Sequence, residues 1–251
     1  MDQAEELRNV IKKQNQRTKK PARIITVTSG KGGVGKSNIA VNLAVQFQRM
    51  GLKTIIFDAD IGLANVEVMF GTIPQYSLND LIYHDKEIED IITDGPEGVG
   101  FISGGSGIMG LSNLTLDQIS YLVKSVEKLS VIADIVIVDT GAGISDSVME
   151  FVASSPEILL VTTPEPSSLT DAYSLLKMLY RNPKYDKNES VIHVLTNRVA
   201  SFGDGIGCKT VSGWLCPLYW DHPTGCDVRE SGADTKTGFH RVAECKVFKT
   251  V

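Results

Sequence analysis

The sequence predicts an α/β fold, with a mostly parallel β-sheet flanked by helices and an atypical, irregular C-terminal tail. Between residues 23 and 199, short runs rich in Val, Ile and Leu alternate with longer segments that have apolar residues at helical spacing. The short runs are almost continuously apolar, which indicates strands buried on both faces, as in parallel sheets. A glycine-rich loop joins the first of these strands to the first helix.

Several segments in succession have the composition of buried strands. They are residues 23–28, 53–60, 100–105, 133–140, 157–164 and 190–199. The segments between them that have helical spacing are 37–51, 77–84, 115–129, 145–155 and 168–181. Gly51 is typical of a helix end, and Ser77 is typical of a helix N-cap. In such a fold, ligands bind at the carboxyl ends of the strands, so the functional site is expected there.

Changes in composition divide the chain into three parts. Residues 1–21 hold an amphipathic pattern that predicts a helix, followed by a basic run that we interpret as a solvated linker. Residues 22–200 carry the alternating pattern and form the main predicted domain. Residues 201–251 show neither a sustained helical period nor clear alternating strands. Irregular or disordered structure is therefore expected in this last part.

Charge and hydropathy argue against two classes of protein. The chain has 30 acidic and 25 basic residues and a net charge of −5, so its overall charge does not favour nucleic acid, and no nucleic-acid partner is expected. No apolar stretch approaches the ~18 residues that a membrane-spanning helix needs. The acidic, polar start MDQAEELR is unlike a secretory signal. We therefore expect a cytoplasmic protein.

The segment SGKGGVGKS, residues 29–37, fits the phosphate-binding loop pattern between a strand and a helix. Glycines let backbone N–H groups turn inward around phosphate oxygens, and the helix N-terminus adds the positive end of its dipole. Lys36 is expected to reach the β- and γ-phosphates, and the Ser37 hydroxyl to bind Mg²⁺. The predicted cofactors are therefore ATP and Mg²⁺. The residues expected around the phosphates are Gly30, Lys31, Gly32, Gly33, Val34, Gly35, Lys36, Ser37 and Asn38.

Three aspartates mark strand ends near this loop. Asp139 ends a strongly apolar strand, and a carboxylate at that point can hold the metal directly or through water. Taken alone, Asp139 would be an ordinary strand-ending turn residue. Asp58 and Asp60 lie at the tip of the second strand. We expect Asp60 to orient the water that attacks the γ-phosphate, and Asp58 to support the metal site with Ser37 and Asp139.

Five motifs together resemble the MinD/ParA class of deviant Walker A ATPases: KGGVGKS, DADIGLAN, DTGAG, TTPEP and TNR. The resemblance covers about residues 22–199. Within that class, the chain is most similar to the flagellar number and placement regulators of the FlhG type, also called YlxH or FleN. Its start, DQAEELR, resembles the motif by which those regulators engage the flagellar GTPase FlhF. The resemblance implies an ATPase that dimerises when it binds ATP and resets when it hydrolyses ATP to ADP and phosphate.

The resemblance also implies roles for individual residues. Lys31 would reach across the dimer to the partner's nucleotide, where negative charge builds on the transferred phosphoryl group. Lys31, Lys36 and Asp60 would thus be the catalytic residues, and Asp139 the switch residue. Asn197, in the TNR motif with Arg198, matches a residue that contacts adenine.

The implied partners are a second copy of the chain, FlhF, flagellar basal-body and C-ring components and, in the family, the inner face of the cell membrane. Glu165 would lie near the dimer interface. Gln3 would be offered to the active site of FlhF, in a helix that also carries Leu7 and Arg8. An unremarkable surface glutamine is the alternative reading of Gln3.

The tail departs from the family pattern. Family members continue with another helix, a strand and a loop near the base, and they end in an amphipathic helix that binds membrane. Residues 201–251 show none of these features and hold both tryptophans and all of the cysteines, Cys208, Cys216, Cys226 and Cys245. We interpret this as a changed reading frame or another replacement of the normal end. The wide cysteine spacing is unlike ordinary zinc modules, and disulfides are not expected in the cytosol.

Other functions stay open at this point. An altered tail would be compatible with a weak or inactive interaction module that engages its GTPase through the N-terminal helix alone. A cell-division site selector of the MinD type is disfavoured mainly by the DQAEELR start. Iron–sulfur reductases of this fold need cysteines near the switch loops, and residues 1–200 contain none.

Overall fold

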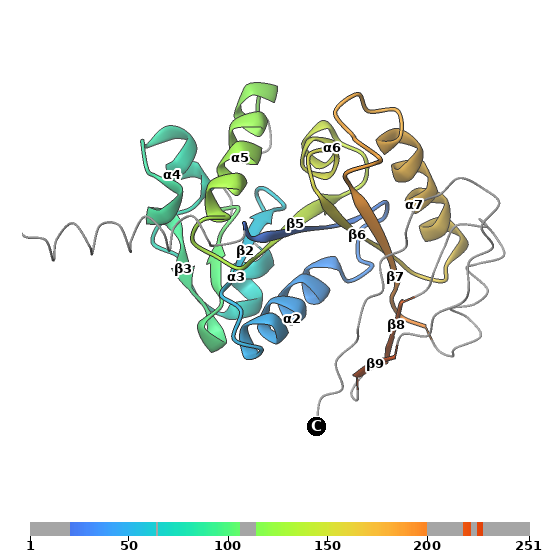
Figure 1. Ribbon diagram of the computed structural model, residues 1–251, viewed down its shortest axis with the longest axis horizontal. Helices are drawn as coiled ribbons and strands as arrows, with labels where there is room; N and C mark the ends of the chain where they lie inside the picture. Colours follow the sequence, from blue (N-terminus) through green and yellow to red (C-terminus); the bar gives the residue numbers. More distant parts are fainter. Residues whose placement is uncertain (1–20, 64, 106–113, 200–217, 222–224, 228–251) are drawn as a thin grey trace, which may run out of the picture.

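The computed structural model describes residues 21–63, 65–105, 114–199, 218–221 and 225–227. Within these residues, the strands form one sheet in the order β3-β4-β2-β5-β1-β6-β7-β8-β9 (Figure 1). The strands are β1 (Arg23–Ser29), β2 (Thr54–Ala59), β3 (Thr93–Asp94), β4 (Gly100–Ile102), β5 (Ile135–Ala142), β6 (Glu157–Thr162), β7 (Val191–Thr196), β8 (Leu218–Asp221) and β9 (Gly225–Asp227). All neighbours pair in parallel except β3 with β4 and β8 with β9. The predicted α/β fold with a mostly parallel sheet is confirmed.

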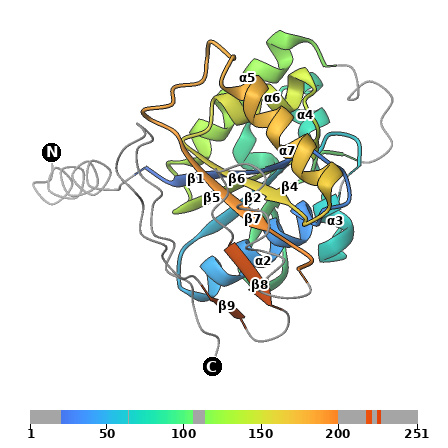
Figure 2. The same cartoon turned by 90° about the vertical axis from the view of Figure 1, so that its right-hand side faces the viewer.

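Helices cover both faces of this sheet (Figures 1 and 2). They are α2 (Lys36–Arg49), α3 (Asn65–Phe70), α4 (Leu78–Tyr83), α5 (Leu116–Leu129), α6 (Asp146–Ala153) and α7 (Pro166–Leu179), with the short 3₁₀ turns η1 (Ile88–Ile91) and η2 (Pro96–Gly98). Helices α2 and α3 lie on one face, and α4 to α7 lie on the other. None of the helices in the described residues is long and apolar enough to cross a membrane.

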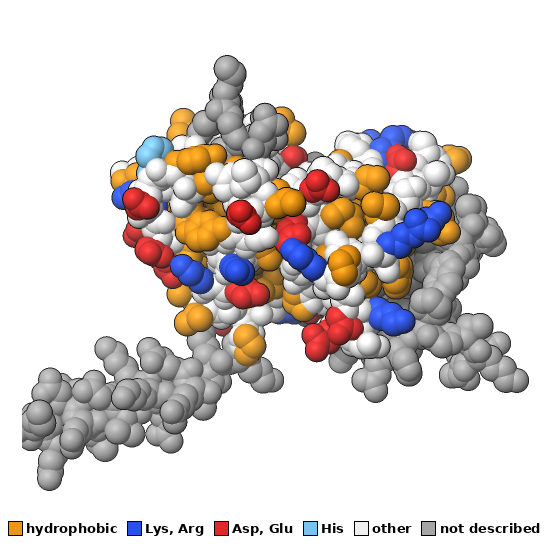
Figure 3. Space-filling view, turned by 90° about the horizontal axis from the view of Figure 1, so that it is seen from above, with side chains coloured by type: hydrophobic (Ala, Val, Ile, Leu, Met, Phe, Trp, Pro, Cys, Tyr) orange, Lys and Arg blue, Asp and Glu red, His pale blue; other side chains and the backbone are white. Residues whose placement is uncertain are grey.

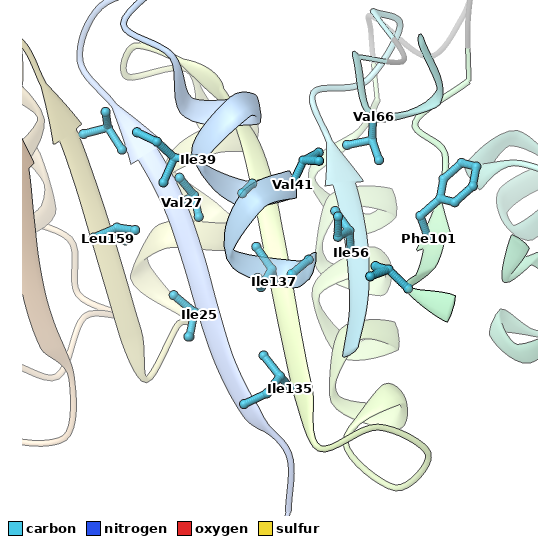
Figure 4. Packing of buried hydrophobic residues seen from close by; sticks show 14 of the residues in the cluster. Ile25, Val27, Ile39, Val41, Ile56, Val66, Phe101, Ile135, Ile137 and Leu159 are labelled. Carbon is cyan, nitrogen blue, oxygen red and sulfur yellow. The ribbon is translucent and has the colours of Figure 1, made fainter. Parts of the chain in front are cut away.

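The strand sequences are apolar throughout because both faces of each central strand are buried. Ile135 and Ile137 of β5 pack under α2, whereas Val136 and Val138, which alternate with them, pack toward α5. Figure 4 shows the α2 side of this arrangement, where Ile39 of the helix lies over β1. Successive strand residues point to opposite faces, so continuous apolar runs fill two cores at once.

Several local predictions can be compared directly with the structure. The Ser77 side chain accepts a hydrogen bond from the Asn79 N–H at the start of α4, and Asp80 completes a capping box. The short elements α3, η1, η2 and β3 were not predicted. In the tail, where no clear strands were expected, the structure describes the short strands β8 and β9. The rest of residues 200–251 lies outside the described part of the chain.

The face that carries α4 to α7 mixes charges of both signs with apolar side chains. In Figure 3, acidic and basic groups are interspersed over the part of this face that the structure describes. Glu150 of α6 forms an ion pair with Lys184, and Lys128 of α5 pairs with Glu87. These two lysines are thus compensated by neighbouring carboxylates.

Candidate nucleotide-binding site

The glycine-rich loop connects β1 to α2 at the carboxyl edge of the sheet, as the sequence predicts. Gly33 and Gly35 have φ angles of 73° and 98°, which residues with a side chain rarely adopt. The loop borders an open cavity of ≈ 990 Å³. The loop residues that line this cavity are Gly32, Gly33, Gly35, Lys36, Ser37 and Asn38.

The loop is also packed tightly against α7. A Cβ atom on Gly30 would lie 2.2 Å from the backbone carbon of Asp171 and 2.6 Å from the nitrogen of Ala172. No side chain fits such a space, so Gly30 is needed for the close approach of two backbones. Helix α7 therefore fixes the start of the loop from one side.

Lys36 is the first residue of α2 and has only 8% of its surface exposed. Burial lowers the pKa of its ammonium group, and the nearby carboxyls of Asp139 and Asp60 oppose this shift. The positive charge of this buried lysine is thus balanced by the two carboxyl groups near it. An incoming polyphosphate would meet this cation at the base of the cavity.

Asp58, the last residue but one of β2, is paired with Asp139, which lies within β5 and not at its end as predicted, because β5 continues to Ala142. Both are fully buried. Burial, followed by the charge of Asp139, raises the pKa of Asp58 to about 8, although the N–H groups of Val66 and Asp60 donate to its carboxyl group. Burial raises the pKa of Asp139 to about 6, against the opposing effects of the Ser37 hydroxyl and the Lys36 ammonium. Two adjacent buried carboxyls keep their protons to a higher pH than exposed ones, unless a cation offsets their negative charges.

The donors present at this point fit a magnesium ion. Neither carboxylate oxygen of Asp139 has a hydrogen-bond partner of normal geometry in the described residues, and such buried orphan groups are costly. Ser37 lines the cavity beside it. Mg²⁺ in nucleotide sites uses a few protein oxygens, with waters and phosphates completing the shell. The described residues contain no group of three His, Cys, Asp or Glu side chains that could hold a metal by themselves.

Asp60 is half-buried on the cavity wall, and burial raises its pKa against the effects of Lys36 and Asn65. Its Oδ2 accepts a 2.8 Å hydrogen bond from Asn65 Nδ2 at the start of α3. Asn65 holds the Asp60 carboxyl in place, and our sequence reasoning gave it no role. The signal was present, because Asn65 ends the quoted DADIGLAN motif.

Lys31 contacts the start of α7. Its Nζ donates to Glu165 Oε2 at 2.7 Å and to Ser167 Oγ at 2.8 Å. Both acceptors belong to the same chain, at the start of α7. The side chains of Lys31 and Glu165 remain 36% and 60% exposed, so the pair lies at the surface.

Asn197 and Arg198 follow β7, which lies two strands away from β1 in the sheet. Asn197 Nδ2 donates a 2.8 Å hydrogen bond to the carbonyl oxygen of Val34. Arg198 adopts a φ of 57° and lines the cavity. The structure thus brings together the predicted residues of the loop, the aspartates and the TNR motif. The predicted partner residues Gln3, Leu7 and Arg8 lie outside the described part of the chain.

The cavity continues past the loop to an apolar wall that we did not predict. Leu63, Val68, Met69 and Leu114 line this part. Leu63 and Val68 are 65% and 77% exposed. Several exposed apolar side chains beside a polar site are typical of a surface that another molecule covers.

Comparison with known proteins agrees with this geometry. The ParA family model, described as NUBPL iron-transfer P-loop NTPase, matches residues 20–197. The antiactivator FleN of Pseudomonas aeruginosa is 41% identical over 185 residues, which cover 74% of this chain and 65% of FleN. The flagellum site-determining protein YlxH of Helicobacter pylori is 35% identical over 209 residues, covering 81% of this chain and 69% of YlxH. The chain thus spans about two thirds of the length of these relatives.

Solved structures show the same fold. The septum site-determining protein MinD of Pyrococcus horikoshii, complexed with Mg-ADP, superposes with a TM-score of 0.63 at 27% identity and covers 76% of this chain and 77% of its own. A ParA family ATPase of Chlorobium tepidum gives a TM-score of 0.67 at 23% identity, with 80% and 85% coverage, which supports the fold alone. The family match over the loop, the aspartates and Asn197, together with the likeness to FleN and YlxH, shows that the chain belongs to the ParA family of P-loop NTPases, as an FlhG-type (FleN/YlxH) member of the MinD/ParA class.

Proposed function

We propose that this protein is an ATP-dependent dimerising switch that hydrolyses ATP and helps to set flagellar number or placement. The observation that carries the proposal is the buried carboxyl group of Asp139, whose oxygens lack a hydrogen-bond partner of normal geometry, beside Ser37 and Lys36 at the base of a phosphate-binding loop. This arrangement has unsatisfied acceptors for a divalent cation and a cation for a polyphosphate. A Mg-nucleoside triphosphate supplies both missing charges at once.

Each residue of the site has a distinct task in this mechanism. The loop N–H groups and Lys36 bind the β- and γ-phosphates and draw charge toward the leaving oxygen. Ser37 and Asp139, supported by Asp58, would hold Mg²⁺, which neutralises charge on the phosphates. Asp60, fixed by Asn65, orients a water molecule in line with the γ-phosphate. Asn65 is a positioning residue because it acts through Asp60.

Lys31 is the residue that would link the two subunits of the dimer. In the single chain, Lys31 is held by Glu165 and Ser167 at the surface, and exposed ion pairs add little to stability. The pair can therefore open at low cost when a stronger anion is offered. We propose that Lys31 then reaches the triphosphate of the partner, while the apolar wall around Leu63 and Val68 is covered by the dimer.

The replacement of Lys31 by alanine tests this dimer. In the unchanged protein, the ATP turnover rate per molecule should rise with protein concentration, because the active site is completed in trans. Lys31→Ala should reduce turnover at high concentration about a hundredfold and remove the concentration dependence, while Mg-ATP still raises the thermal midpoint. Steady-state phosphate release over a range of protein concentrations measures the effect.

Lys124→Ala is the matched control, since Lys124 is an exposed lysine on α5. It should keep both the rate and its concentration dependence. Concentration-dependent turnover that survives in Lys31→Ala would contradict the trans role. Absence of turnover in the unchanged protein would instead favour the non-catalytic interaction module.

The flagellar role draws on the relatives FleN, an antiactivator, and YlxH, a flagellum site-determining protein. The family description names iron transfer, but residues 1–200 contain no cysteine to bind iron near the loop. A cell-division role of the MinD type is less well supported, because the septum site-determining relatives are only 29–32% identical to this chain. The implied partners are FlhF and components of the basal body and C-ring, with peripheral attachment at the inner membrane face.

Gln3 offers a test of the FlhF partnership. We propose that Gln3 enters the FlhF active site, with Leu7 and Arg8 holding the helix against it, because an amide can orient the attacking water. Adding the full chain to purified FlhF should raise GTP hydrolysis at least several-fold, and Gln3→Ala should lose most of that increase without weakening binding. Equal stimulation by both chains would rule out this role for Gln3.

A further inference from the structure

Asn197 makes a contact that ties the last strand before the tail to the phosphate loop. Its Nδ2 atom donates a 2.8 Å hydrogen bond to the carbonyl oxygen of Val34, a residue 163 positions away in the sequence. Val34 is fully buried. Resemblance to the family suggested a different role, a contact with adenine, so the two roles need to be separated.

The Asn197 side chain is held from the sheet. Its backbone N–H donates to the carbonyl oxygen of Thr162 at 2.8 Å, which continues the pairing of β6 with β7. The next residue, Arg198, turns the chain away with a positive φ of 57°. The amide is thus presented to the loop by two neighbouring strands rather than by a free segment.

The contact also accounts for the glycine at position 35. A Cβ atom there would lie 2.5 Å from Asn197 Nδ2, so the amide and a side chain at this position exclude each other. Gly35 additionally has a φ of 98°. Spatial exclusion and backbone conformation therefore both favour glycine here.

The orientation of one peptide bond follows from this contact. In a trans peptide, the carbonyl oxygen and the following N–H point in opposite directions. Because the Val34 carbonyl is bound by Asn197, the Gly35 N–H is turned away from Asn197. Gly35 itself lines the cavity, where the phosphate oxygens of a nucleotide would lie.

We propose that Asn197 is a positioning residue for phosphate binding, which locks the Val34–Gly35 peptide so that the Gly35 N–H faces the bound polyphosphate. This inference rests on the proposed nucleotide-binding function. Its effect on affinity is independent of the base. A flipped peptide would instead present the Val34 carbonyl oxygen to the phosphate. The partial negative charge of this oxygen would then repel the negative phosphate.

Ligands with and without a base distinguish this role from adenine recognition. Binding of Mg-ATP, Mg-GTP and Mg-tripolyphosphate is measured by calorimetry for the full chain and for Asn197→Ala and Asn197→Asp. We expect Asn197→Ala to weaken all three ligands by the same factor, about tenfold. Asn197→Asp keeps the shape but cannot donate when ionised, so the loss should be at least as large. Asn188→Ala, an exposed asparagine before β7, should bind all three ligands normally.

Each other outcome has a definite meaning. If a variant binds ATP more weakly but tripolyphosphate normally, and its preference between ATP and GTP changes, Asn197 contacts adenine and the proposal is overturned. Unfolding of both Asn197 variants, seen as loss of the thermal transition without ligand, makes Asn197 a residue of the fold and also overturns it. If the unchanged chain binds none of the three ligands, the proposed function itself is wrong.

Discussion

Replacing Lys36 by alanine is expected to lower the affinity for Mg-ATP about a hundredfold, which is the effect of losing a charged hydrogen-bonding group in a buried site. Lys36 is a buried cation at the start of α2, near the carboxyls of Asp60 and Asp139. In the unchanged chain, a ligand at a hundred times its dissociation constant adds about 2.7 kcal/mol of stability. The rise in thermal midpoint with Mg-ATP should therefore nearly vanish in Lys36→Ala.

The comparison must use the ligand-dependent change in the midpoint, because Lys36→Ala also removes a positive charge beside two carboxyls and alters the unliganded fold. Lys124→Ala removes the same charge at an exposed site and should keep the full ligand effect. A normal Mg-ATP shift in Lys36→Ala would mean that the nucleotide binds elsewhere and that the loop is not the site.

The sequence predicted those features that depend on residues close together in the chain. The strands follow from continuous apolar runs, the cap from Ser77 before α4 and the phosphate loop from its glycine spacing. Each of these patterns is read within about ten residues, where local backbone conformations and side-chain alternation decide the outcome. These predictions agree with the structure because neighbouring residues decide each of these features.

Contacts between distant segments could not be read in the same way. The partners of Lys31 are 134 and 136 residues away, and Val34 lies 163 residues before Asn197. These contacts exist because β1 lies between β5 and β6 instead of beside β2. Strand order depends on the packing of the whole chain, so the residues of the site could be named from motifs while their contacts could not.

The unliganded protein is expected to lose stability as the pH rises from about 5 to about 9. Burial raises the pKa of Asp139 to about 6 and that of Asp58 to about 8, whereas both ionise near pH 4 in an unfolded chain. Between these values, the folded protein binds more protons than the unfolded chain. Since stability falls with pH wherever the folded state holds more protons, ionisation of the pair costs stability across this window.

The expected loss is on the order of a few kcal/mol, since each pKa unit corresponds to about 1.4 kcal/mol and relaxation around the pair reduces the sum. Thermal or urea unfolding at pH 5, 7 and 9 measures it. Added Mg-ATP should reduce the loss, because the metal binds the ionised carboxylates and replaces the proton. The measurement should be made with and without the ligand at every pH.

Asp58→Asn identifies the group responsible. An amide cannot ionise, so the stability of the variant should change less between pH 7 and pH 9, although it gives up one of the hydrogen bonds that Asp58 accepts from Val66 and Asp60. The variant should thus be the less stable chain at pH 5 and approach or exceed the unchanged chain at pH 9. An unchanged pH dependence would show that Asp58 is ionised throughout, and the paired carboxyls would then need a compensating cation even in the free protein.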